Sequence, residues 1–146
     1  MIYRSQLMMS FHGTGPPQAL QIAAGKIDVT LGGGELGRGF YTGEMLHVAK
    51  RWALHRNQGR DKNVVQFELP MTHWDALNIS ALDANTATLM RGHIRRWDKT
   101  HRYTFRVDVV WSRIVGKLSL NCDQYKWEST LAEATLNSAD CMRSIV

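Results

Sequence analysis

The stretch GRGFYTGEMLHVAKRWA, residues 37–53, decides the fold. Residues 39–42 at its start are predicted to form a short strand, and residues 44–58 a helix that ends at Gly59. Apolar side chains recur at helical spacing along one face of this helix, at Met45, Val48, Ala49, Trp52 and Ala53. A short strand bracketed by glycines therefore leads directly into an amphipathic helix.

Further strands and helices are predicted on both sides of this stretch. The strands are expected at residues 7–12, 27–31, 64–69, 103–111 and 124–128. The helices are expected at residues 16–24, residues 84–99 and from about residue 130. Gly32, Gly33 and Gly34 are expected to form a loop, because three glycines cost too much backbone entropy inside a regular element. Strands and helices mix without regular alternation, which favours an α+β fold over a doubly wound sheet.

The composition is that of an ordinary globular domain. A length of 146 residues suits one hydrophobic core, so residues 1–146 are expected to form a single domain. The net charge of +5 favours an anionic partner, which could be nucleic acid, a membrane surface or a phosphate-bearing cofactor. A role in solubility explains the same charge equally well. Cys122 and Cys141 form no CxxC pair and are expected to be buried thiols in a reducing compartment.

The sequence lacks the usual signals for membranes and export. Its first residues contain no uninterrupted apolar stretch of the kind that a signal peptide has. No apolar run is long enough to cross a bilayer. We therefore expect no membrane partner, and a location in the cytoplasm or delivery into the cytoplasm of a target cell.

Three segments carry the candidate functional residues. The first is Phe11-His12-Gly13-Thr14, at the end of a predicted strand. The second is Gly37-Arg38-Gly39-Phe40-Tyr41, before the helix that contains Trp52. The third is Asp123-Gln124-Tyr125-Lys126-Trp127, late in the chain. Each is ordinary by itself, and their joint occurrence in this order and spacing indicates a site.

The first two segments resemble the NAD-binding signature of ADP-ribosyltransferases of the diphtheria-toxin and poly(ADP-ribose) polymerase type. That signature is His-Gly-Ser/Thr at a strand end, followed by Gly-Lys/Arg-Gly-aromatic-Tyr before a helix. Residues 37–53 are especially similar to small bacterial domains of this fold. The resemblance covers roughly residues 9–131. It implies an ADP-ribosyltransferase-like fold, in which two packed, mostly antiparallel sheets form a split β-sandwich with flanking helices.

The resemblance implies a role for each matching residue. His12 would hydrogen-bond a ribose hydroxyl of NAD, and the backbone of Gly13 would bind the nicotinamide carboxamide. Thr14 would line the same pocket, and Tyr41 and Trp52 would enclose the nicotinamide ring. These residue types suit the chemistry, since a backbone glycine offers one donor and one acceptor at close approach. Two aromatic rings also stack well on a flat heteroaromatic leaving group.

NAD is expected to be the substrate, and the chemistry requires no metal. Arg38, between two glycines, is placed where a cation could reach the NAD pyrophosphate, or it is a charge on the surface of a loop. Cleavage of the glycosidic bond develops positive charge on an oxocarbenium-like sugar. We therefore expect the site to promote cleavage by holding the ribose strained and desolvated. The candidate catalytic residues are His12, Tyr41 and Gln124.

Gln124 departs from the family pattern, in which a glutamate begins the late strand and holds a ribose hydroxyl. An amide can hydrogen-bond that hydroxyl but adds no negative charge. Three explanations are open. Glutamine serves naturally, as in the resembling bacterial domains; or Glu128 supplies the carboxylate, although it lies about 13 Å further along the strand; or the chain is a disabled variant.

The function implied by the resemblance is mono-ADP-ribosyl transfer from NAD to a protein or a nucleic acid, as in a bacterial toxin or effector. A cognate immunity or antitoxin protein is a further expected partner. An NAD glycohydrolase and a catalytically silent NAD-binding module are the alternatives. Arg91, Arg95 and Lys99 are expected to form a helical stripe beside Met90, Ile94 and Trp97, which suits either a phosphate-tracking surface or a solvated helix face.

Overall fold

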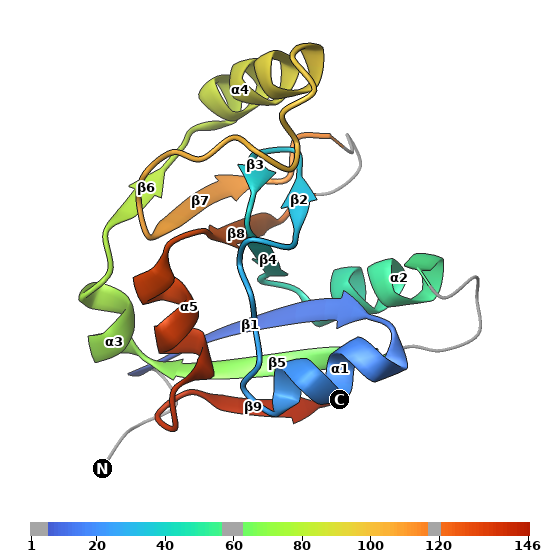
Figure 1. The fold of residues 1–146 in the computed structure, drawn as a ribbon, viewed down its shortest axis with the longest axis vertical. Coiled ribbons are helices and arrows are strands. Elements are labelled where there is room, and N and C mark those ends of the chain that lie inside the picture. Colours follow the sequence, from blue (N-terminus) through green and yellow to red (C-terminus); the bar gives the residue numbers. More distant parts are fainter. Residues whose placement is uncertain (1–5, 57–62, 117–120) are drawn as a thin grey trace. The chain divides into compact units, whose positions relative to one another are not determined.

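A computed structural model describes residues 6–56, 63–116 and 121–146 of the chain (Figure 1). The chain divides into two compact units. Unit 1 comprises Met1–Ile27, Thr42–Ala76 and Ala134–Val146, and unit 2 comprises Asp28–Tyr41 and Leu77–Glu133. A single domain over residues 1–146 stays a prediction.

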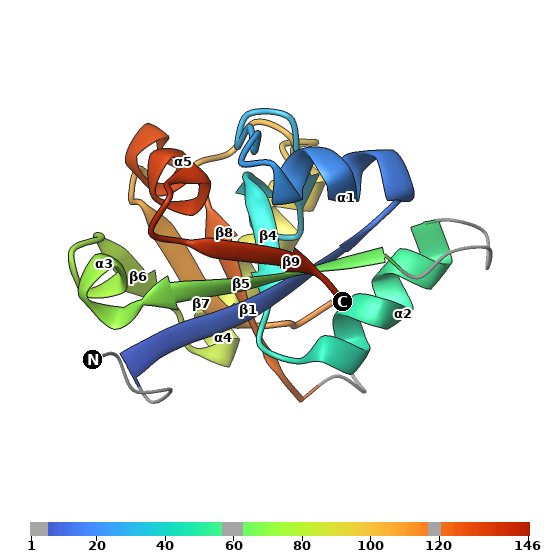
Figure 2. The same cartoon turned by 90° about the horizontal axis from the view of Figure 1, so that it is seen from below.

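Unit 1 is built around three antiparallel strands: β1 (Leu7–Thr14), β5 (Asn63–Pro70) and β9 (Met142–Ile145). Strand β1 pairs with β5 over its whole length, from Leu7 opposite Pro70 to Thr14 opposite Asn63. Figure 2 shows α1 (Pro16–Ala23) and α2 (Leu46–Arg56) on opposite faces of these strands. The short helix α3 (Met71–Asp75) follows β5 directly. Since both faces are covered, β5 forms the centre of the core of unit 1, and its buried side chains are Val64, Val65, Phe67 and Leu69.

Unit 2 contains the strands β6 (Ile79–Ala81), β7 (Val109–Arg113) and β8 (Asp123–Trp127) and the helix α4 (Ala84–Arg96). Strand β6 runs parallel to β7, and β7 runs antiparallel to β8. The side chain of Asp83 caps α4 by accepting a hydrogen bond from Thr86 N at 2.7 Å. The fully buried side chains include Ile94 of α4, Val109 and Val110 of β7, and Trp127 of β8.

Four further elements complete the fold of the described residues. β2 (Gly33–Gly34) and β3 (Gly37–Arg38) pair as a two-stranded sheet in unit 2. β4 (Phe40–Gly43) and α5 (Thr130–Asn137) each give residues to both units. The other strands follow the order β6-β7-β8-β4-β1-β5-β9, a seven-stranded mixed sheet. The predicted α+β class is therefore confirmed.

The predicted strand at residues 27–31 is wrong, because these residues form a loop. Ile27 and Val29 are buried, as in a strand, but their backbone groups have side-chain partners. Ile27 N donates to Oδ1 of Asn137 at 2.9 Å, and Val29 N donates to Oε1 of Glu133 at 3.0 Å. Side chains of α5 thus accept the backbone hydrogen bonds that the carbonyl groups of a neighbouring strand would otherwise accept.

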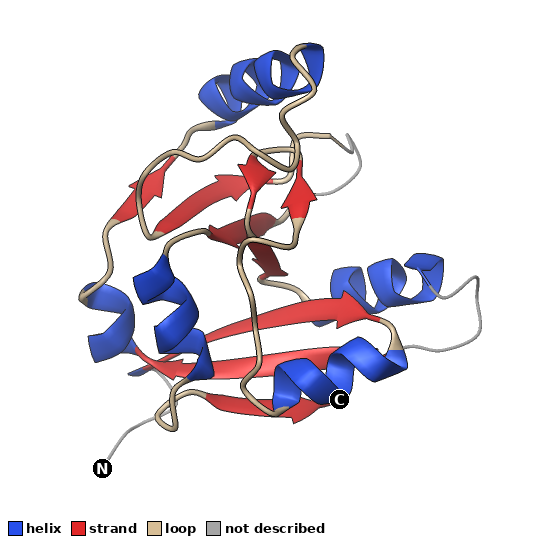
Figure 3. Ribbon diagram, in the orientation of Figure 1, coloured by secondary structure: helices blue, strands red, loops and turns tan. Residues whose placement is uncertain are grey.

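The predicted strand at residues 103–111 begins too early, since β7 starts at Val109. A loop leads from α4 into this strand (Figure 3). Arg106 has a φ of 59°, a left-handed conformation that a strand does not accommodate. Val107 N donates to Oε1 of Glu128 at 3.3 Å in place of a strand partner. The expected loop at Gly32–Gly34 is also partly wrong, because Gly33 and Gly34 form β2. Four elements were not predicted from the sequence: β3, α3, β6 and β9.

The predicted stripe on α4 is wrong in three respects. Trp97 is 59% exposed and stands at the C-cap of the helix, outside the apolar face that contains Ile94. Lys99 lies beyond the end of α4. Arg91 turns toward Glu35 and pairs with it at 3.5 Å, so it does not form part of a purely solvated basic surface.

Candidate active site

The predicted site residues are divided between the two units. His12, Gly13 and Thr14 lie at the end of β1 in unit 1. Arg38, Tyr41 and Gln124 lie in unit 2. Trp52 belongs to α2, and its side chain lies outside the described residues. The two groups of residues are therefore described separately.

Gly13 is required by the packing of unit 1. It faces α2, and a Cβ atom at this position would overlap the backbone oxygen of Ala49 and stand 2.9 Å from Ala53 N. Ala49 and Ala53 form a small core with Val64, which pairs with Gly13 across β1 and β5. The close helix–strand contact thus explains this glycine without any ligand. His12 and Thr14 point to the other face of β1 by the two-residue alternation of a strand.

Gln124 stands at the start of β8, opposite Ser112 of β7, and is 7% exposed. Its amide Nε2 donates a hydrogen bond to Oε1 of Glu35. A carboxylate therefore lies beside the position at which the family pattern has a glutamate. The residue that provides it, Glu35, comes from the loop between β2 and β3, and the sequence analysis did not select it.

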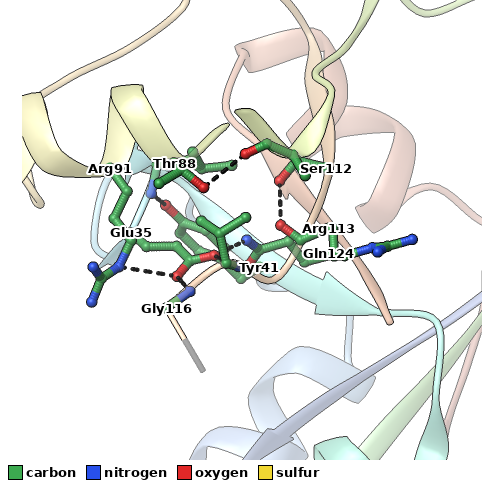
Figure 4. Close-up of polar contacts among 11 residues, drawn as sticks. Glu35, Tyr41, Thr88, Arg91, Ser112, Arg113, Gly116 and Gln124 are labelled. Carbon is green, nitrogen blue, oxygen red and sulfur yellow. Dashed lines mark hydrogen bonds and ion pairs between the residues drawn. The ribbon is translucent and has the colours of Figure 1, made fainter. Parts of the chain in front are cut away.

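Glu35 is at the centre of a cluster of polar contacts (Figure 4). Besides Gln124, its carboxylate accepts from Val115 N at 3.0 Å and from Gly116 N at 2.8 Å. The guanidinium of Arg91 reaches it from α4 at 3.5 Å. The Glu35 side chain is only 15% exposed, so these donors replace most of its contact with water. We name Glu35, Gln124 and Arg91 the carboxylate–amide cluster.

Tyr41 stabilises the loop that contains Glu35 through hydrogen bonds. Its hydroxyl donates to Gly37 O at 2.6 Å and accepts from Leu36 N at 3.1 Å. Its ring packs so closely on Gly34 that a Cβ there would lie 2.7 Å from the ring carbon Cζ. Burial raises the pKa of the Tyr41 phenol, so it stays neutral over the physiological range. The hydroxyl is thus a structural group of this loop.

A buried ion pair holds the same loop from β8. Lys126 is fully buried; its Nζ pairs with Glu128 and donates to Leu36 O at 2.8 Å. The ammonium also lies 4.8 Å from the centre of the Phe105 ring. Burial lowers the pKa of Lys126, and the hydrogen bond to Glu128 opposes this shift.

Glu128 is therefore engaged at the far end of β8 from Gln124. Its Oε2 pairs with Lys126 and its Oε1 accepts from Val107 N. This argues against the hypothesis that Glu128 supplies the carboxylate missing at Gln124. The side chain of Arg38 lines a hollow at this same end. Its contact with an NAD pyrophosphate stays a prediction.

Glu35 could have been suspected from one feature of the sequence. It is the single acidic residue in the glycine-rich stretch 32–39, immediately before the segment that carries the resemblance. An acidic side chain in a loop of glycines is available to reach a distant partner. The partner itself, Gln124, is separated from it by 89 positions, and only the fold brings the two together.

The described ranges contain neither a cluster of metal ligands nor a membrane-spanning helix. No three His, Cys, Asp or Glu side chains gather there as metal ligands. No helix of these ranges has both the length and the apolar character that a bilayer crossing requires. Cys122 and Cys141 are buried thiols, as predicted, and neither is in a disulfide. No known protein family matches the sequence, and a search of curated proteins finds none that is similar.

Proposed function

We propose that the chain is a mono-ADP-ribosyltransferase that cleaves NAD at the nicotinamide glycosidic bond and transfers ADP-ribose to a protein or a nucleic acid. The observation that supports this most is the hydrogen bond between Gln124 and Glu35. It brings a carboxylate next to the residue that stands in the place of the family glutamate. Tyr41, in the same loop system, supports the proposal further.

The carboxylate–amide cluster suits the chemistry of this reaction. Because Nε2 of Gln124 donates to Glu35, the amide oxygen of Gln124 is oriented as the acceptor for a ribose hydroxyl. The adjacent negative charge of Glu35 would stabilise the positive charge that develops on the sugar. Arg91 reduces this effect but keeps the carboxylate in place. Glu35 thus acts through Gln124 and is a positioning residue in this proposal.

The cluster also explains why glutamine, and not glutamate, occupies position 124. A glutamate there would face the Glu35 carboxylate at hydrogen-bond distance, and the two charges would repel each other. An amide instead provides the donor that Glu35 needs. This argues against a disabled variant and favours the explanation in which glutamine serves naturally.

The remaining parts of the proposal follow the resemblance. His12, Gly13, Thr14, Tyr41 and Trp52 would bind the nicotinamide riboside part of NAD, and the fold would be a split β-sandwich of two packed sheets. The protein would act in the cytoplasm, its own or that of a target cell, as a toxin or effector with a cognate immunity protein. The acceptor would be a macromolecule rather than water.

Nicotinamide release from NAD by the purified chain tests the proposal, with and without added RNA or lysate protein. We expect Gln124→Ala to lower release at least about 100-fold, because a positioned polar group contributes that much to such transition states. The matched control is Gln66→Ala, since Gln66 also donates to a glutamate, Glu68, but lies on β5 outside the cluster. The control is expected to keep its activity.

Each outcome has a distinct meaning. Release that rises with one acceptor supports a transferase and identifies its substrate class. Release that no acceptor changes would make the chain an NAD glycohydrolase, and NAD binding without release would make it a binding module. If the chain neither binds nor cleaves NAD, or if Gln124→Ala behaves like its control, the proposed site is wrong.

A further inference from the structure

An open hollow of ≈ 370 Å³ lies within unit 2, at the end of β8 that is remote from Gln124. Two arginines, Arg38 and Arg106, and two carboxylates, Asp108 and Glu128, contribute to its wall. Hydroxyl groups complete the polar lining, among them those of Thr104 and Thr130. We name it the Arg38–Arg106 hollow. The carboxylate–amide cluster shares none of its residues.

The two carboxylates of the hollow are already occupied by internal donors. Asp108 accepts from Asn78 N at 2.7 Å with one oxygen and from Ser129 Oγ at 2.6 Å with the other. Glu128 accepts from Val107 N and pairs with Lys126. Both oxygens of each carboxylate thus have partners other than the two arginines.

Among the described residues, neither arginine forms an ion pair with a carboxylate of the hollow, although Arg38, after the hydrogen bonds from Thr30, helps to lower the pKa of Asp28 outside it. Nε of Arg38 is buried and has no hydrogen-bond partner there. A buried donor without an acceptor is costly, so its presence calls for an explanation such as a bound anion. Arg106 is exposed, and its backbone is held at a φ of 59°. Such strain in a residue other than glycine is typical of functional positions.

The hydrogen-bond donors of the hollow define the ligand. The pair of Lys126 and Glu128 is neutral, and two further carboxylates act on the arginines: Asp108 in the lining, and Asp28 outside it, which interacts with Arg38. A phosphodiester carries one negative charge and accepts hydrogen bonds from guanidinium and hydroxyl groups. We propose that the Arg38–Arg106 hollow binds the phosphodiester group of a molecule other than NAD.

Position along β8 separates this ligand from NAD. The resemblance places the nicotinamide ribose at Gln124, and the NAD phosphates are attached only one sugar further on. Glu128, at the hollow, lies about 13 Å beyond Gln124 along an extended chain. A phosphate in the hollow is therefore not one attached to that ribose, and this inference is the alternative to the predicted contact of Arg38 with the NAD pyrophosphate. The exclusion of NAD rests on the proposed function, whereas binding in the hollow does not.

Titration with dimethyl phosphate, followed by NMR or calorimetry, tests the site without any turnover of NAD. We expect Arg38→Gln and Arg106→Gln each to weaken binding at least tenfold. The matched control is Arg102→Gln, an exposed arginine of the same loop that donates to Asp98 O and does not line the hollow. A uridine dinucleotide that binds more tightly than dimethyl phosphate would identify nucleic acid as the source of the phosphodiester; equal binding would show that the phosphate alone is recognised.

A second variant separates binding from folding. Arg106→Gly relieves the left-handed backbone, so we expect it to unfold at a higher temperature than the wild type while it loses dimethyl phosphate binding. Absence of binding in the wild type, or unchanged binding in Arg106→Gly, would overturn the proposal. Displacement of dimethyl phosphate by NAD would also overturn it, since the hollow would then be part of the NAD site. Failure of NAD cleavage alone would leave it untouched.

Discussion

Replacement of Gln124 by glutamate tests the reasoning on the carboxylate–amide cluster most directly. The substitution turns the amide that donates to Glu35 into a second carboxyl at the same place. At neutral pH either both carboxylates are ionised, or the pair binds a proton. Two like charges about 4 Å apart repel by about 4 kcal/mol at an effective dielectric constant of 20. Binding a proton at pH 7.5, against an ordinary glutamate pKa of about 4.3, also costs about 4 kcal/mol.

The expected loss of stability is therefore about 2–4 kcal/mol at pH 7.5, because Arg91, 3.5 Å from Glu35, offsets part of the repulsion. For a chain of this size each kcal/mol lowers the melting temperature by roughly 2–4 °C. The loss has a definite pH dependence. In the folded state the pair holds a proton to a higher pH than the unfolded chain does. The variant is thus close to wild-type stability near pH 4.5, and the deficit grows as the pH rises toward 7.5.

Thermal unfolding at pH 4.5 and pH 7.5, monitored by circular dichroism, is the assay. The double substitution Glu35→Gln with Gln124→Glu exchanges the two groups and restores a donor–acceptor pair, so it is expected to recover much of the loss at pH 7.5. Gln21→Glu, at an exposed position of α1, is the control and should show no such pH-dependent loss. The reasoning is refuted if Gln124→Glu is as stable as the wild type at pH 7.5, or if the exchange is no better than the single substitution.

Three further predictions concern packing and charge, each read from the change in melting temperature. Gly13→Ala should lower the free energy of unfolding by about 1–3 kcal/mol or more, because the added Cβ clashes with α2. Gly92→Ala, where no atom lies within 4 Å of the added Cβ, should instead stabilise α4 by about 0.5–1 kcal/mol. Equal effects of the two substitutions would contradict the packing argument. Lys126→Met should lower the free energy of unfolding by about 3–5 kcal/mol, because it leaves Glu128 buried and unpaired. Adding Glu128→Gln should recover much of this loss. If the second substitution recovers nothing, the loss is not electrostatic. Burial raises the pKa of Cys141 to about 11 from 9.0, so the fold favours the neutral thiol and its stability falls as the pH rises through this interval. Cys141→Ala should make that fall less steep. If the melting temperatures of the variant and the wild type depend on pH in the same way, the assignment is refuted.

Local signals in the sequence predicted the elements that local physics determines. Residues 16–24 carry two prolines at the start and Gly25 at the end, and α1 is found there within one residue. The predicted strand at 124–128 is found as β8 within one residue at each end. The errors fall where distant residues decide the structure. The apolar residues Ile27 and Val29 alternate with polar ones as in a strand. Their backbone N–H groups nevertheless donate to the side chains of Asn137 and Glu133, 110 and 104 positions away, and not to a neighbouring strand.

The candidate site shows the same contrast between local sequence signals and contacts between distant residues. The order and spacing of its motifs selected Tyr41 and Gln124, which unit 2 does bring into one loop system with Glu35. Glu35 could not be selected in this way, because its role depends on contacts with Val115, Gly116 and Gln124 that no periodicity encodes. Gly13 was selected for a ligand, and the packing of α2 gives it a second reason. A glycine that a motif selects can thus be required by packing alone.

The loop from Glu35 to Tyr41 links these observations, since it is fixed from several sides at once. Glu35 is held by the backbone of residues 115 and 116, Leu36 O by Lys126, and the turn at Gly37 by the Tyr41 hydroxyl. Each anchor is buried or partly buried, so releasing one leaves polar groups without partners. Gln124 and Lys126 stand on the same strand, two residues apart, and hold successive residues of the loop. The orientation of the Gln124 amide and the position of the Tyr41 ring are therefore set together, and a substitution at Lys126 should disturb both.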